Sequence, residues 1–301
     1  MKAILLTAYG DVDRLQLRDV AEPTVGPNEI KVRMAGASIN PIDWKLRSGA
    51  YHAYMPLPLP AILGRDASGT VLAVGPGVTG FAVGAQVMGR VNATYAELVV
   101  GPTEAWTALP AGMDLVDAGA YPLVLLTGAQ LIEDAVRPSR GAEVLVTGAT
   151  GSTGRVAVFA AKAAGARVLA GVRAKHRGEA ASLGADQVVA LDDEADVARL
   201  PALDAIADTV GGETTQRLLF KLKAGGTVGS VVGEPKGARE RGLVVRAIMA
   251  HADSRRLAQL AGAVAEGKLS IPIVRRFPLA EAGQAHKLAE SGAGGKVLLT
   301  G

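Results

Sequence analysis

One segment in the middle of the chain, residues 143–164, constrains the fold more than any other feature. An apolar strand over 143–147 runs into a turn with glycines at 148, 151 and 154, and a helix over 154–164 follows at once. Glycine permits the sharp turn and lets the backbone approach a pyrophosphate, while the helix N-terminus offers that anion N–H groups and a positive dipole end. The segment therefore predicts a dinucleotide-binding βαβ unit; the alternative is an ordinary turn with incidental glycines.

The residues expected to contact the cofactor phosphates are those of the turn and of the first helical positions. They are Gly148, Gly151, Ser152, Thr153 and Gly154.

The residues after the next strand, 167–172, indicate which dinucleotide binds. Proteins that prefer NAD place an acidic residue near this point to bind the ribose 2′-hydroxyl. This chain has Arg173, Lys175, His176 and Arg177 there instead. Cations suit a 2′-phosphate, so NADPH is the expected cofactor; the alternative is that they are ordinary surface cations at the start of a helix.

Two later strand ends are expected to line the same edge of the sheet, where open α/β sheets bind their ligands. Asp208 and Val210 stand at the end of a strand over 203–208, and Val232 and Gly233 stand at the end of a strand over 227–232. Plain turn positions are the alternative reading of these residues.

The two parts of the chain differ in character near Asp114. Before it, short strands are expected over 3–7, 29–37, 67–74, 86–91 and 95–100, with Gly and Pro turns typical of a compact, mostly β domain. After it, a helical region over 115–134 leads into strands alternating with helices, which is typical of a parallel sheet. Further strands are expected over 187–190, 243–249, 273–277 and 296–300, and helices over 175–183, 213–222, 254–266 and 279–290.

Composition excludes several classes of protein. The net charge is only +3 and aromatic residues make up 4%, so a basic stripe with stacking aromatics for nucleic acid is not expected. The chain has no cysteine, which excludes disulfides and thiolate zinc sites. No apolar run is long enough to span a membrane, and the first residues read as a strand, so a cytoplasmic enzyme is expected.

Several separate segments together resemble the medium-chain dehydrogenase/reductase superfamily, in its zinc-free quinone oxidoreductase branch, which is zeta-crystallin-like. Besides the glycine turn, these segments are Ala37–Lys45, Leu63–Gly69, Gly75–Val78, Tyr95–Leu98, Leu126–Ala129, Leu183–Asp186 and Gly295–Val297.

The resemblance implies an α/β chain with a GroES-like, β-rich catalytic domain and a Rossmann domain with a doubly wound parallel sheet. The catalytic domain is expected over residues 1–117 and 268–301, and the NADPH-binding domain over 118–267. The active site would lie in the cleft between them. A homodimer is also implied, with the strand near 243–249 as a candidate for the contact.

The resemblance also implies roles for single residues. Asn40 would lie beside nicotinamide and substrate, Thr127 near the nicotinamide end of the cofactor, and Lys296 among the cofactor contacts. Asp43 and Arg65 stand where zinc-dependent relatives have Cys and His ligands, so no metal is expected. Tyr51 and Tyr54 follow in a loop that could wall the substrate pocket, with plain packing as the alternative. Asp66 could simply pair with Arg65.

The expected reaction is hydride transfer from NADPH to quinones or to α,β-unsaturated carbonyl compounds. The catalytic candidates are Asn40, Asp43, Tyr51 and Arg65; of these, Asn40, Tyr51 or Arg65 could donate a hydrogen bond to the carbonyl oxygen. Three hypotheses stay open: a quinone oxidoreductase, an enoyl or alkenal double-bond reductase, and a non-catalytic NADPH-binding regulator. A short-chain reductase is a poorer match, since the glycine turn lies mid-chain and no Tyr-x-x-x-Lys pair is found.

Overall fold

The computed structural model describes residues 1–301, which divide into two compact units. Unit 1 combines both ends of the chain, Met1–Leu123 and Ala252–Gly301, and unit 2 is Val124–His251. Residues 252–267 thus belong to unit 1, although the sequence placed them in the nucleotide-binding domain. The reason is that helix α7 (Ser254–Ala265) packs against strand β8 (Trp106–Ala108) of unit 1. No helix is long and apolar enough to cross a bilayer.

Unit 2 holds a six-stranded sheet in which all neighbouring strands are parallel. Its order is β11-β10-β9-β12-β13-β14. The strands are β9 (Glu143–Thr147), β10 (Arg167–Val172), β11 (Gln187–Ala190), β12 (Leu203–Asp208), β13 (Leu222–Ser230) and β14 (Val244–Ala247). The strand order reverses between β9 and β12, and sheets of this kind bind ligands at such a point, beyond the carboxyl ends of the strands. The doubly wound parallel sheet is confirmed.

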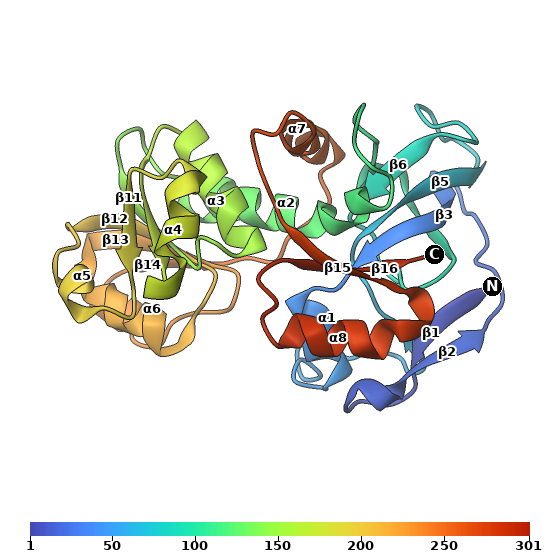
Figure 1. Cartoon of the computed structure of the whole chain (residues 1–301), viewed down its shortest axis with the longest axis horizontal. Coiled ribbons are helices and arrows are strands. Elements are labelled where there is room, and N and C mark those ends of the chain that lie inside the picture. Colours follow the sequence, from blue (N-terminus) through green and yellow to red (C-terminus); the bar gives the residue numbers. More distant parts are fainter. The chain divides into compact units, whose positions relative to one another are not determined.

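Helices cover both faces of this sheet (Figure 1). Alternate residues of β9 point to opposite faces: Val144 and Val146 pack with Ala157 of α3, whereas Leu145 packs with Leu218 of α6. The helical segments of the unit are α2, which begins in unit 1 (Pro122–Gln130), a π-helix (Leu131–Val136), α3 (Ser152–Ala163), α4 (Arg177–Ala180), α5 (Glu194–Ala198), α6 (Gly212–Leu218) and short 3₁₀ turns at Ala174–His176, Ala181–Leu183, Leu219–Lys221 and Arg239–Arg241.

Unit 1 is a β-rich domain built from two sheets. A seven-stranded sheet runs β15-β16-β3-β5-β6-β8 with β7 also paired to β3, and a three-stranded sheet runs β2-β1-β4. The strands are β1 (Lys2–Leu6), β2 (Leu15–Asp19), β3 (Glu29–Ser38), β4 (Ala61–Ile62), β5 (Ala67–Val74), β6 (Gln86–Gly89), β7 (Leu98–Pro102), β8, β15 (Ile273–Pro278) and β16 (Lys296–Thr300). The GroES-like architecture is confirmed.

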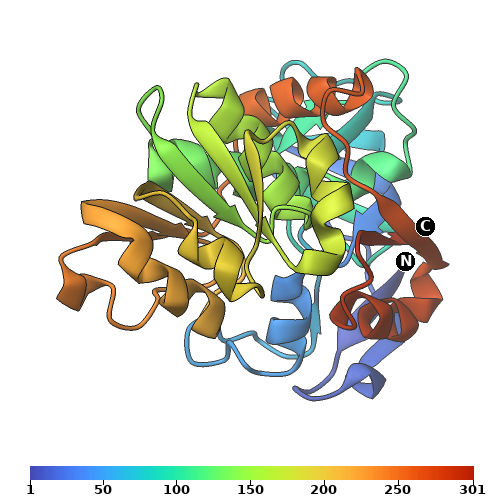
Figure 2. The ribbon, with the colours of Figure 1, turned by 60° about the vertical axis from the view of Figure 1, so that its left-hand side comes forward.

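The two ends of the chain meet inside unit 1. Strand β16 pairs antiparallel with β3, and α8 (Ala282–Glu290) packs near α1 (Pro41–Arg47), as Figures 1 and 2 show in blue and red. A single apolar core of unit 1 therefore joins residues from both ends, with Ile30 and Val32 on β3 beside Val297 and Leu299 on β16.

One expected strand differs in a way that matters for the site. The strand predicted over 95–100 starts only at Leu98, because Tyr95 and Ala96 contact β1 instead. The backbone N–H of Ile4 donates to Tyr95 O at 2.8 Å, and the Tyr95 ring is fully buried. The phenol of Tyr95 is thereby placed inside unit 1.

Candidate active site

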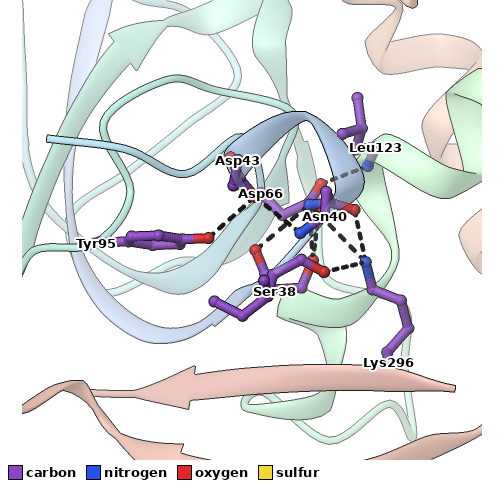
Figure 3. A network of polar contacts seen from close by, with 8 residues as sticks. Ser38, Asn40, Asp43, Asp66, Tyr95, Leu123 and Lys296 are labelled. Carbon is purple, nitrogen blue, oxygen red and sulfur yellow. Dashed lines mark hydrogen bonds and ion pairs between the residues drawn. The ribbon is translucent and has the colours of Figure 1, made fainter. Parts of the chain in front are cut away.

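A cluster of buried polar side chains lies inside unit 1 (Figure 3). We call it the polar network, and it consists of Ser38, Asn40, Asp43, Asp66, Tyr95, Lys296 and the backbone N–H of Leu123. Its members come from the end of β3, the start of α1, the residues before β5, the residues before β7, the start of α2 and the first residue of β16. Buried polar groups are tolerated only when they are hydrogen-bonded, and nearly all of these are.

The amide of Asn40 is fully engaged within the network. Its Nδ2 donates to Asp66 Oδ2 at 2.7 Å and to Ser38 Oγ at 3.2 Å, while its Oδ1 accepts from Lys296 Nζ at 2.7 Å. Only 1% of the residue is exposed. Both amide hydrogens are therefore used inside the protein, which leaves Asn40 poorly suited to donate to a substrate oxygen.

Asp66 is the acceptor at the centre of the network. Its Oδ1 accepts the Leu123 N–H at 2.5 Å, at the start of α2, and its Oδ2 accepts from Ser38 and Asn40. Lys296 Nζ lies 4.0 Å from Oδ2. Asp66 thus pairs with Lys296, and no ion pair joins it to Arg65 as the sequence had allowed. Burial raises the pKa of Asp66 and lowers that of Lys296, and the attraction between the two charges opposes both shifts.

Asp43 occupies the third position of α1, where its Oδ2 accepts the Asn40 N–H at 2.8 Å, one half of a capping box. The Tyr95 hydroxyl donates to the same oxygen at 3.0 Å, while Oδ1 is buried and has no hydrogen-bond partner. Burial raises the pKa of Asp43 to about 6. This carboxyl group is consequently easier to protonate than an exposed one. Its Oδ2 is engaged in hydrogen bonds within the fold.

The remaining catalytic candidates lie outside the network and are more accessible. The Tyr51 hydroxyl accepts from Lys45 Nζ at 3.2 Å, so its own hydrogen is available to another acceptor. Arg65 Nη2 contacts Met55 Sδ at 3.1 Å and forms no ion pair. Tyr54, in contrast, is 87% exposed and stacks edge-on against Tyr51. Tyr51 and Arg65 therefore have donor hydrogens that are not engaged in hydrogen bonds to other protein oxygens.

In unit 2 the glycine turn has the geometry that the sequence predicts. Gly148 has φ +62°, and a Cβ on Gly154 would lie 2.1 Å from Gly148 O, so α3 can approach the turn only with glycine at 154. Gly151 precedes α3, and the first N–H groups of the helix, at Ser152 and Thr153, have no intrahelical acceptor. The turn can therefore present several N–H groups to one anion.

The four basic residues after β10 differ in their partners. Arg177 pairs with Asp196, and His176 lies 3.4 Å from Glu179. Arg173 and Lys175 are exposed and have no ion-pair partner among residues 1–301. One carboxylate is close by, since Asp192 Oδ1 accepts the Ala174 N–H at 2.7 Å. Two of the four predicted cations are thus free to meet an external anion.

Among the later strand ends, Asp208 has a structural position. It is completely buried, and its Oδ1 accepts from the Thr147 and Thr215 hydroxyls at 2.8 and 2.6 Å. The N–H groups of Val210 and Gly211 donate to the same oxygen. Asp208 thereby ties the end of β12 to the end of β9. Val210 is 49% exposed beside it, and Val232 and Gly233 follow β13.

Some residues that shape these sites could not be identified from local sequence patterns. Arg155 Nε donates to Thr150 O at 3.0 Å, and its guanidinium pairs with Glu179, so one side chain joins the glycine turn to α4. In unit 1, Arg47 binds Glu290 at 2.9 Å and His286 Nδ1 at 3.3 Å. Such contacts depend on residues far apart in sequence.

Two further residues expected at the cofactor have these positions. Lys296 donates a hydrogen bond to Asn40, and Thr127 lies half-buried on α2.

The positions that resemble zinc ligands do not fit a zinc ion. Arg65 is a cation and cannot coordinate a metal, and Oδ2 of Asp43 is occupied by the Asn40 N–H and Tyr95 hydroxyl. No group of three or more His, Asp or Glu side chains in residues 1–301 is arranged to hold a metal.

Comparison with protein families gives two matches. Residues 26–120 match the alcohol dehydrogenase GroES-like domain, and residues 183–299 match the zinc-binding dehydrogenase family. The first region lies within unit 1. The second region begins in unit 2 and continues into β16 of unit 1.

Individual relatives point the same way. The chain is 32% identical to a quinone oxidoreductase of Pseudomonas aeruginosa over 95% of its length and 94% of the relative's. It is 28% identical to a 2-haloacrylate reductase of Burkholderia sp over 95% and 94%. A chloroplast envelope quinone oxidoreductase homolog of Arabidopsis thaliana is 31% identical, with 63% of this chain and 60% of the relative covered.

Solved structures agree with the sequence relatives. The quinone oxidoreductase from Coxiella burnetii superposes with a TM-score of 0.90 at 28% identity, covering 100% of this chain and 99% of that one. The Escherichia coli quinone oxidoreductase complexed with NADPH gives a TM-score of 0.87 at 27% identity, with 100% of both chains covered.

Proposed function

Because this chain belongs to the quinone oxidoreductase branch of the medium-chain dehydrogenase/reductase superfamily and is an oxidoreductase, we propose that it reduces quinones with NADPH and without zinc. The observation that carries the choice of cofactor is the pair of exposed, unpaired cations after β10, Arg173 and Lys175. A 2′-phosphate would give these cations the counter-charge that the protein does not supply.

The glycine turn and the residues after β10 would hold the dinucleotide. The N–H groups at the start of α3 suit the pyrophosphate, and Gly148 and Gly154 keep side chains out of its way. Arg155 fixes the turn through Thr150 and Glu179, so Glu179 is neutralised and does not repel a phosphate. The bound dinucleotide supplies a hydride equivalent.

Residues of unit 1 would act on the acceptor. Reducing a quinone builds negative charge on a carbonyl oxygen, and a preorganised donor stabilises that charge. Tyr51 and Arg65 have the donor hydrogens for this role, whereas both Asn40 amide hydrogens are committed to Asp66 and Ser38. Asn40 would then hold its neighbours in place and would not polarise the acceptor itself.

A double-bond reductase is the second candidate. The similarity to a 2-haloacrylate reductase over 95% of this chain supports it. Its chemistry needs the same two donors, because hydride addition to an enone also places charge on the carbonyl oxygen. The two candidate functions therefore differ in the acceptor that is reduced, a quinone or an enone, and share the same cofactor.

We also propose a cytoplasmic homodimer that pairs through β14. This strand is the outer edge of its sheet, so one row of its backbone groups has no partner strand. Val244 and Met249 beside that edge are 39% and 64% exposed. A second copy could continue the sheet and cover both side chains.

The test is turnover with each cofactor and each acceptor. NADPH and NADH are titrated into the purified protein, and oxidation is followed with 1,4-benzoquinone and with a simple enone. Arg173→Glu is expected to raise the KM for NADPH roughly tenfold or more and to change that for NADH little, since each 1.4 kcal/mol is about tenfold in affinity. Arg140→Glu is the control, because Arg140 is exposed before β9, at the opposite end of the sheet.

Each outcome has a defined meaning. Faster turnover of the quinone than of the enone supports the proposal, and the reverse supports the double-bond reductase. Tight NADPH binding without oxidation by either acceptor would favour a regulatory protein. No binding of either dinucleotide would refute the nucleotide site.

A further inference from the structure

The carboxylate of Glu179, on α4, contacts both parts of the nucleotide site in unit 2. Its Oε1 pairs with the Arg155 guanidinium, and its Oε2 lies 3.4 Å from His176 Nδ1. Arg155 stands on the first turn of α3, beside the glycine turn, and His176 belongs to the loop that carries Arg173 and Lys175. The carboxylate therefore lies between the turn that suits the pyrophosphate and the loop that suits a 2′-phosphate.

A free carboxylate at this place would select against NADPH. The 2′-phosphate is a phosphate monoester, which carries about 1.5 to 2 negative charges near pH 7. NADH has a neutral hydroxyl at the same ribose position, and a carboxylate can accept a hydrogen bond from it. Repulsion between two like charges in a partly desolvated site changes affinity by roughly tenfold or more. The charge of Glu179 therefore bears on the choice between the two dinucleotides.

Arg155 neutralises this carboxylate from the side of the glycine turn. Only 8% of Arg155 is exposed, and its Nε also donates to Thr150 O at 3.0 Å. An arginine stays charged at any physiological pH, and a side chain that is already held in place loses little further freedom when it pairs. The pair thus differs from one formed by two mobile surface side chains, and it cancels the charge of Glu179 at all times.

No other guanidinium pairs with Glu179 in residues 1–301. Arg177, two positions before it on α4, pairs with Asp196 instead. His176 makes the one other charged contact. Asp192 is the second carboxylate at this loop, where it accepts a backbone N–H. Removing Arg155 would therefore leave Glu179 without a permanent counter-charge.

We infer that the Arg155–Glu179 pair sets the preference for NADPH: Arg155 is a positioning residue that neutralises Glu179, and without it this carboxylate would disfavour the 2′-phosphate. The inference rests on the proposed function and adds a determinant of its cofactor specificity. Arg155 then has two separable effects. Its hydrogen bond to Thr150 supports the turn and so affects every dinucleotide, whereas its charge affects only those with a 2′-phosphate.

Fluorescence titration with NADPH and NADH separates the two effects, because binding needs no acceptor. The measured quantity is the ratio of the Kd for NADH to the Kd for NADPH. Arg155→Met is expected to weaken both dinucleotides and to lower this ratio roughly tenfold or more. Arg155→Met/Glu179→Gln should return the ratio to within about threefold of the wild type, although both Kd values stay raised. Glu179→Gln alone should increase the ratio.

A pair of cofactor fragments isolates the phosphate itself. Adenosine 2′,5′-bisphosphate and AMP differ only in the 2′-phosphate, and calorimetric titration gives the Kd of each. Their ratio should change in the same direction as that of the dinucleotides in every variant. High salt should reduce the effect of Arg155→Met on the ratio, since the repulsion is partly screened.

Arg167→Met is the matched control. Arg167 Nη1 lies 3.3 Å from Glu143 Oε1 at the first residues of β10 and β9, so this variant removes an arginine–glutamate pair at the opposite end of the same sheet. Its ratio should equal that of the wild type. Circular dichroism and the melting temperature check folding. If Arg155→Met does not fold, Glu179→Gln still decides, because an unchanged ratio in that variant would refute the inference.

The outcomes separate the inference from the proposed function. Equal weakening of both dinucleotides in Arg155→Met would show that Arg155 only supports the turn, and the inference would be wrong while the proposed function stands. A double variant that keeps the low ratio would also contradict it. If the ratios shift as expected but neither quinone nor enone is reduced, the inference stands and the proposed reaction is wrong. No binding of either dinucleotide to the wild type would refute both.

Discussion

Lys296 Nζ lies 2.7 Å from Asn40 Oδ1, although the two residues are 256 positions apart in the chain. The contact fixes which end of the amide faces the cation, and Nδ2 therefore faces Asp66. The charge of Lys296 and the hydrogen bonds of Asn40 thus act on the same buried carboxylate from two sides.

Removing Lys296 should destabilise unit 1 strongly. Lys296→Met leaves Asp66 buried without a cation, which typically costs about 3–5 kcal/mol of unfolding free energy. Both tryptophans, Trp44 and Trp106, belong to unit 1, so their fluorescence during urea denaturation follows this unit. Lys296→Met/Asp66→Asn should recover much of the loss; a double variant no better than the single one would contradict the pairing.

Asp43 should make unit 1 less stable as pH rises. Its folded-state pKa of about 6 lies above the ordinary value of 3.8, so the fold favours the protonated acid. That contribution is complete below about pH 4 and is lost as pH rises through about 6, by up to about 3 kcal/mol. Asp43→Asn should remove this pH dependence, and the measurement is the difference in unfolding free energy between variant and wild type from about pH 4.5 to 8.

His286 should act in the opposite direction. Burial and the charge of Arg47 lower its pKa from 6.5 to about 3, so the fold keeps the ring neutral. The contribution of the neutral ring to the unfolding free energy is fully present above about pH 6.5. It falls as the unfolded chain becomes protonated, by about 2 kcal/mol at about pH 5. His286→Gln should lose this fall at low pH.

NMR titration provides a direct check on His286. The chain has three other histidines, of which His52 and His251 are exposed and His176 is half-buried. The imidazole signal of His286, identified by its loss in His286→Gln, should stay constant between about pH 5 and 8 because the folded-state pKa lies near 3. A His286 signal that moves within this range would show that the ring is not held neutral.

Gly154→Ala should damage the nucleotide site. The new Cβ would lie 2.1 Å from Gly148 O, so the turn or α3 must move. We expect NADPH affinity to fall about tenfold or more, measured by fluorescence titration, together with a loss of stability of about 1–3 kcal/mol. Gly178→Ala in α4 is the control, since its Cβ meets nothing within 4 Å and alanine favours a helix by up to about 1 kcal/mol. Equal affinity in both variants would contradict the close approach.

The parts of the fold that the sequence predicts are those set by local pattern. The glycine turn, the alternation of strands and helices after Asp114 and the cations after β10 depend on residues near each other in the chain, and each lies where expected. The strand at 95–100 is shorter than predicted because Tyr95 pairs with β1, a contact that no local pattern encodes.

The candidate site depended more on distant contacts. Asn40 and Asp43 could be singled out by resemblance, but the engagement of the Asn40 amide requires Asp66 and Lys296 to arrive from other strands.

The pairing of β16 with β3 also sets an order of events during translation. Unit 2 is one continuous segment, so all its strands have left the ribosome before β16 is made. Until Lys296 emerges, β3 lacks its neighbour on one side and Asp66 lacks its cation. A nascent chain stalled before β16 would therefore contain all strands of unit 2 and an incomplete unit 1. Quality-control proteases would encounter this incomplete unit 1 first.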